Sequence, residues 1–201
     1  MLEMRSFFRL LSAAVVVVGL NGCALFLKEP AVPGVSQAQQ RIYGLSSWRL
    51  EGRIGVQTAK DAWHANLFWE HEGRQDRLRI SGPFSQGAVS IILQDDLIYI
   101  NEGHGVVESS REPDVMLKQR LGFAVPLASL RYWVMGVPSP VAEHAAERDS
   151  SGRIRGFRHL GWLLSFDRFV NVRDLVLPQK MTIQGHEVKL KLIADEWVIR
   201  G

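Results

Sequence analysis

The chain has 201 residues, of which 46% are hydrophobic and 22% are charged, and it carries a formal net charge of +3. This composition is typical of a globular protein with a sizeable core and excludes an intrinsically disordered chain. The basic residues are spread along the chain, which argues against nucleic-acid binding as the main role and fits a surface near anionic lipid or an acidic partner.

The first 23 residues have the layout of a secretory signal. Arg5 and Arg9 precede a short apolar run that ends at Leu20, and Asn21-Gly22 leads to Cys23, the only cysteine. The run is too short to span a bilayer, so we predict that residues 1–22 form a cleaved signal peptide. The segment resembles the lipobox of bacterial lipoproteins, whose cysteine becomes the acylated first residue. The alternative is an ordinary cleaved signal followed by a chance cysteine.

Residues 23–38 are predicted to form the lipidated N-terminus and a flexible tether, because Pro30, Pro33 and Gly34 disfavour regular structure. Residues 39–201 are then a single domain. Ser36 is a good N-cap for a short helix that reaches Leu45.

From Trp48 onward the apolar residues recur every second position, which predicts β-strands. The connections are too short for parallel crossovers, so neighbouring strands are expected to be antiparallel. The predicted strands are residues 48–56, 63–70, 76–81, 87–94, 97–101, 105–109, 153–159, 161–167, 179–184, 187–193 and 196–200.

Two helices interrupt the strands. Residues 114–121 form the first, which ends at Gly122, with Val115, Leu117 and Leu121 expected on one side. Residues 127–135 form the second, which is followed by Gly136 and Pro138, as is usual after a helix C-terminus. The sequence therefore predicts a mainly β fold of about eleven antiparallel strands, curled into a barrel or into a half-barrel covered by helices.

The motifs of common enzymes and metal sites are missing from the sequence. It contains no His-x-x-x-His pair, no Gly-x-Ser-x-Gly and no glycine-rich phosphate loop. We therefore expect no metal, no cofactor and no enzymatic activity. An envelope hydrolase stays as an alternative that lacks an identified nucleophile and base.

What remains is apolar. Six tryptophans fall on predicted strands or on the second helix, and they can form either a core or the wall of a pocket. The loop of residues 81–87 carries Pro83 and, at its tip, Phe84. Phe84 either tucks back onto the domain or is exposed, where it could insert into a membrane interface.

Several segments together resemble one family, the outer-membrane lipoprotein receptors LolB. The resemblance covers nearly the whole chain and is most specific in the second helix and the closing segment. It rests on the lipobox (residues 20–23), Asn66-Leu67-Phe68-Trp69, Gly82-Pro83-Phe84, residues 130–138, Gly161-Trp162, Leu177-Pro178, and residues 190–192 and 197–199.

This resemblance implies a half-open barrel lidded by helices, with an apolar cavity for acyl chains. Such receptors take lipoprotein clients from a soluble periplasmic carrier, LolA, and insert them into outer-membrane lipid. It further implies a periplasm-facing monomer anchored through Cys23, with Ala24 compatible with outer-membrane residence and Phe84 where a leucine is usual. The expected cavity lining is Trp48, Ile54, Phe68, Trp69, Leu130, Trp133, Val134, Trp162 and Leu190. The runner-up is a lipoprotein that only tethers or scaffolds, with a filled core.

Overall fold

The computed structural model describes residues 36–82, 87–103, 105–140 and 145–200. The predicted signal peptide, Cys23 and the tether up to residue 35 lie outside the described residues. The same holds for Pro83 and Phe84 in the predicted membrane-insertion loop.

The described residues form one antiparallel sheet of eleven strands, which confirms the mainly β prediction. The strands are β1 (Ser47–Gln57), β2 (Ala62–Glu72), β3 (Gln75–Ser81), β4 (Val89–Gln94), β5 (Leu97–Asn101), β6 (Val107–Ser110), β7 (Ala145–Arg148), β8 (Ile154–His159), β9 (Trp162–Val172), β10 (Leu175–Gly185) and β11 (Val188–Ile199). The first and last strands pair at the centre of the sheet, which leaves β6 and β7 as its two edges.

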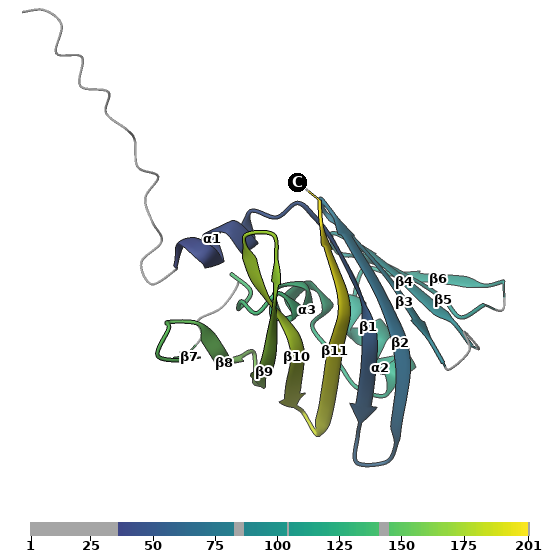
Figure 1. Cartoon of the computed structure of the whole chain (residues 1–201). Coiled ribbons are helices and arrows are strands. Elements are labelled where there is room, and N and C mark those ends of the chain that lie inside the picture. The colour runs from purple at the N-terminus through teal and green to yellow at the C-terminus, as the bar shows by residue number, and fades with distance from the viewer. Residues whose placement is uncertain (1–35, 83–86, 104, 141–144, 201) are drawn as a thin grey trace, which may run out of the picture. The chain divides into compact units, whose positions relative to one another are not determined.

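Three helices accompany the sheet: α1 (Gln37–Tyr43), α2 (Pro113–Leu121) and α3 (Leu127–Val134). Ser36 caps α1 through a reciprocal capping box with Gln39, as its sequence predicts. Gly122 ends α2 in the left-handed conformation, at φ 81°. The sheet curves around α2 and α3, as Figure 1 shows, so these two helices cover its concave side.

The concave face of the sheet is set by the two-residue period of the strands. Leu50 and Val56 of β1 and Leu67 and Trp69 of β2 are buried on this face. On α2 the expected apolar side was partly wrong. Val115 is 49% exposed, whereas Met116 and Leu117 are buried, because a helix places residues three and four apart, not two apart, on one face.

The predicted strand boundaries near the C-terminus were wrong in one informative place. The segments 187–193 and 196–200 are one strand, β11, because a bulge opposite Glu51 and Gly52 absorbs Asp195 without ending the pairing. The side chain of Asp195 accepts two hydrogen bonds from Arg53, at 2.8 and 3.0 Å. Only glycine fits at position 52, since a Cβ there would lie 2.1 Å from the carbonyl oxygen of Ile193.

Candidate functional site

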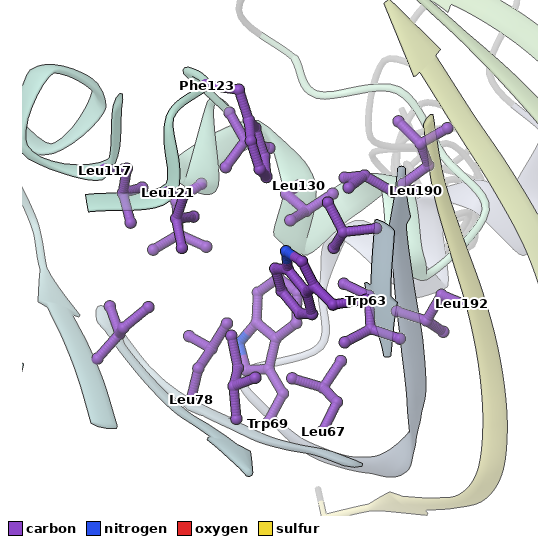
Figure 2. A pocket seen from close by; sticks show the side chains of 17 residues that line it. Trp63, Leu67, Trp69, Leu78, Leu117, Leu121, Phe123, Leu130, Leu190 and Leu192 are labelled. Atoms are coloured by element: carbon purple, nitrogen blue, oxygen red, sulfur yellow. The ribbon is translucent and has the colours of Figure 1, made fainter. Parts of the chain in front are cut away.

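An apolar cavity lies between the concave face of the sheet and the two covering helices. Strands β1 to β4, β10 and β11 form its wall, and α2, α3 and the segment between these helices form its cover; Figure 2 shows the side chains pointing into it. Its lining is hydrophobic throughout: Ile54, Val56, Trp63, Leu67, Trp69, Leu78, Ile80, Ile91, Leu117, Leu121, Phe123, Val125, Leu127, Leu130, Ile183, Leu190 and Leu192.

Four of the lining side chains are only half-buried, and they mark where the cavity reaches solvent. They are Ile54 of β1, Trp63 of β2, Ile80 of β3 and Leu121 at the end of α2. Trp63 is the second residue of β2, and Ile80 is the penultimate residue of β3, so both lie toward the end of the sheet that carries the β1–β2 and β3–β4 connections. We infer that the mouth of the cavity opens at this end.

The cavity is narrow in this structure. Its volume is about 60 Å³. Its hydrophobic lining offers water few hydrogen-bond partners, so an apolar occupant is favoured there over water. Long acyl chains need more volume, so the cavity must widen to admit them.

Four of the nine predicted lining residues do line this cavity: Ile54, Trp69, Leu130 and Leu190. The prediction for Phe68 was wrong, because the neighbouring Leu67 and Trp69 point inward and alternation places Phe68 on the outer face of β2. There the guanidinium of Arg49 lies over the ring of Phe68, with its Cζ 5.9 Å from the ring centroid.

The other four predicted residues belong to the packed core beside the cavity. Trp48 packs between Trp69 and Trp197 in tilted and edge-on contacts, with ring centroids 5.4 and 5.6 Å away. Trp133 and Val134 of α3 are both fully buried, and Trp133 faces β8 and β9, where its ring centroid lies 6.2 Å from that of Trp162. The concave face is thus divided into a filled half under Trp133 and a hollow half under Leu127 and Leu130.

Sequence reasoning missed the lining from α2 and from the α2–α3 connection, above all Leu117, Phe123 and Val125. The spacing of Leu117 and Leu121, four residues apart on a helix, is the signal that predicts a shared face. Phe123 and Val125 lie in an irregular segment, where no periodicity indicates direction.

A buried carboxylate lies next to the cavity wall. Asp76 of β3 has no exposed surface, and its Oδ1 accepts from Trp69 Nε1 at 3.1 Å and lies 3.0 Å from His71 Nδ1. Its Oδ2 is 3.3 Å from Nη2 of Arg131 on α3. Asp76 therefore holds a wall residue, Trp69, and also ties the covering helix α3 to the sheet.

No helix in the described part of the chain combines the length and apolar character needed to cross a membrane. Within the same residues, no three His, Cys, Asp or Glu side chains gather as a set of metal ligands would.

A curved, open antiparallel sheet with a helical cover over its hollow concave side is a fold that this chain shares with proteins of known structure. A LolA superfamily protein from Nitrosomonas europaea matches with a TM-score of 0.52 at 10% identity, over 82% of this chain and 90% of that one. A DUF1329 family protein from Desulfovibrio piger matches with a TM-score of 0.54 at 8% identity, over 80% of this chain and 88% of that one. These likenesses establish the fold.

The particular family follows from the sequence itself. The family model of the outer membrane lipoprotein LolB matches residues 46–197, and the chain belongs to this family. Among its relatives, the outer-membrane lipoprotein LolB of Pseudomonas paraeruginosa is 26% identical over 94% of this chain and 95% of that protein. The outer-membrane lipoprotein LolB of Chromohalobacter salexigens is 29% identical over 91% and 87%.

Proposed function

We propose that this protein is anchored in the outer membrane through Cys23, faces the periplasm, accepts lipoproteins from a soluble carrier of the LolA type and inserts them into the membrane. The observation that carries the proposal is the hydrophobic cavity under α2 and α3 in a member of the LolB family. Acyl chains of the client occupy this cavity between leaving the carrier and entering the bilayer. The protein acts as a monomer and as a binding protein, not as an enzyme.

Transfer runs down a gradient of affinity and uses no nucleotide. Each methylene of an acyl chain that moves from water into an apolar environment contributes about 0.8 kcal/mol to the free energy of transfer. A lipoprotein therefore has to pass from one apolar site to another without entering water. The cavity accepts the acyl chains directly from the carrier, and the bilayer is their final acceptor. A narrow cavity that must widen for its occupant binds less tightly than a preformed one, which favours release.

The position of the mouth supports delivery at the same end of the sheet. Ile80 lies at the mouth and is followed within a few residues by Pro83 and Phe84. We propose that this loop enters the membrane interface, where aromatic side chains are favoured. Acyl chains that leave the cavity then meet the bilayer without crossing water.

The runner-up role, a tether or scaffold, predicts a filled core. The hydrophobic cavity favours the receptor role instead, because a scaffold gains nothing from leaving apolar volume unfilled.

The test uses the Cys23→Ala form of the chain, which keeps the whole domain but has no acylation site. This form is mixed with carrier from the same organism loaded with a lipoprotein, and the two proteins are separated by size. We expect the lipoprotein to move to the Cys23→Ala protein. If it stays on the carrier, the receptor function is wrong and the tethering role replaces it.

A further inference from the structure

Two neighbouring valines at the start of β6 are exposed to an unusual degree. Val106 is 64% exposed and Val107 is 57% exposed, the highest values among the large apolar side chains that the structure describes. They follow Gly103 and Gly105, both with positive φ, in the turn between β5 and β6. Figure 1 shows this hairpin at one extremity of the sheet. Two adjacent apolar side chains on a projecting turn are costly in water unless something else covers them.

The β5–β6 turn lies beside the β3–β4 connection. Strand β3 ends and β4 begins at the end of the sheet where β5 passes into β6, since Asn101 pairs with Ser90 and Ile80 with Val89. A Cβ built on Gly103 would lie 3.8 Å from the carbonyl oxygen of Ala88. The exposed valines therefore lie at the end of the sheet where β3 ends and β4 begins, which is also the end where the cavity opens.

The charges that flank the valines are paired. Glu102 precedes them and Glu108 follows them, and both carboxylates form ion pairs with Arg120 of α2, that with Glu102 at 3.7 Å. The hydrogen bond to Glu108 also raises the pKa of the Arg120 guanidinium above its ordinary value. Arg120 compensates one of the two carboxylates, so the turn repels anionic phospholipid less than it would with both carboxylates unpaired.

We propose that Val106 and Val107 form a second membrane contact, which enters the interfacial layer of a phospholipid bilayer next to the β3–β4 loop. This inference rests on the proposed function and extends its membrane surface from one loop to two. A convex pair of valines suits a fluid lipid layer, which closes around any apolar shape, whereas a protein partner would need a matching groove. With two loops in the membrane, the cavity mouth is held toward the bilayer in one orientation.

The chain has a single cysteine, Cys23, so replacing it leaves a background in which one new cysteine can be labelled selectively. In the Cys23→Ala background, Val106→Cys provides one site for an environment-sensitive fluorophore, and Val176→Cys provides a matched site. Val176 is 45% exposed and lies near the β9–β10 turn, at the opposite end of the sheet. Phe84→Cys serves as a third site and reports on the β3–β4 loop alone. Each labelled protein is mixed with vesicles of phosphatidylethanolamine and phosphatidylglycerol.

We expect the label at position 106 to brighten, shift to the blue and be quenched by spin-labelled lipid, while the label at position 176 stays aqueous. If the label at 84 enters the bilayer and the label at 106 does not, the second contact is wrong while the proposed function stands. If the label at 106 responds to added carrier and not to vesicles, the valines bind a protein and the proposal is overturned.

Vesicle affinity gives an independent readout. The double variant Val106→Ser/Val107→Ser, again without the acyl anchor, should bind vesicles about tenfold more weakly, because two apolar side chains no longer transfer into lipid. Val115→Ser on α2, where the valine is 49% exposed, is the control and should bind as the parent does. Equal affinity of the double variant and the parent would contradict the inference.

Discussion

Leu160 has a backbone conformation that suits its side chain poorly. It lies with Gly161 in the two-residue turn between β8 and β9, at φ 52° and 43% exposed. A branched side chain at positive φ is strained, whereas asparagine tolerates this region and favours such turns. We predict that Leu160→Asn raises the free energy of unfolding by about 1 kcal/mol.

Urea denaturation with tryptophan fluorescence measures this change. Leu160→Ala, which keeps a Cβ and gains no amide, should not stabilise the fold. If Asn and Ala behave alike, the backbone strain at position 160 is not what limits stability there.

The pair formed by Asp76 and Arg131 is the buried charge interaction that joins α3 to the sheet. The side chain of Arg131 is 17% exposed, and that of Asp76 is not exposed at all. Arg131→Met leaves the buried carboxylate of Asp76 with only Trp69 and His71 as partners, so it should lower the free energy of unfolding by about 3 kcal/mol.

A double-mutant cycle separates pairing from packing. In Asp76→Leu/Arg131→Met neither charge remains, so we expect the double variant to recover much of the stability lost by Arg131→Met. The readout is again the midpoint of urea unfolding. Additive losses would show that the two side chains do not interact, and the link between α3 and the wall residue Trp69 would lose its support.

At the scale of elements, each strand carries a cavity face and an outer face, and the two faces should respond differently to the same substitution. Ile80→Glu places a charge at the mouth of the cavity, on a half-buried residue. We predict that it weakens binding of a fluorescent acyl probe at least about tenfold, because a carboxylate cannot be desolvated cheaply beside an acyl chain.

The matched control is Phe68→Glu, a half-buried apolar residue on the outer face of the same sheet. It should bind the probe as the parent does. Loss of binding in Phe68→Glu, with unfolding curves unchanged, would show that the acyl site lies on the outer face of the sheet and not in the cavity.

The sequence was sufficient to predict the antiparallel sheet and the inward face of β1, because the alternation of apolar residues indicates both. On β2 the same alternation is present, but Phe68 was assigned to the inward face against it. The predicted number of strands was right only because two errors cancelled. β7 was missed, since Ala145 to Arg148 has no alternation, and β11 was divided at the bulge that absorbs Asp195. The start of β10 was also predicted too late, at residue 179, because Pro178 disfavours a strand. In the structure β10 includes Pro178 at a register shift, a place where a strand tolerates proline.

The site was harder to predict than the fold. Periodicity shows which residues face inward, but not which part of the concave face is filled and which part is hollow. Trp48 and Trp162 point inward as predicted and yet pack into the core. That division depends on where α3 lies over the sheet, which is a tertiary contact without a local signal in the sequence.

At the scale of the whole molecule, uptake and delivery should depend on different parts. Phe84 belongs to the proposed membrane loop. We predict that Phe84→Glu, in the acylated protein, accepts lipoprotein from the carrier as the parent does but delivers it to liposomes more slowly. Transfer measured in two stages, carrier to receptor and receptor to liposome, distinguishes the steps.

Val176→Glu is the control for an added charge, since Val176 lies at the opposite end of the sheet. It should leave both stages unchanged. Equal delivery by Phe84→Glu and the parent would remove the loop from the mechanism.

The central claim is that acyl chains of a lipoprotein occupy the cavity under α2 and α3. A client lipoprotein with a photoreactive acyl chain, transferred from the carrier and then irradiated, tests this most directly, with cross-linked residues identified by mass spectrometry. The account predicts adducts on cavity-lining residues such as Leu130, Leu121 and Ile80. Adducts confined to the outer face, at Phe68 for example, or transfer without any adduct in the cavity, would contradict it.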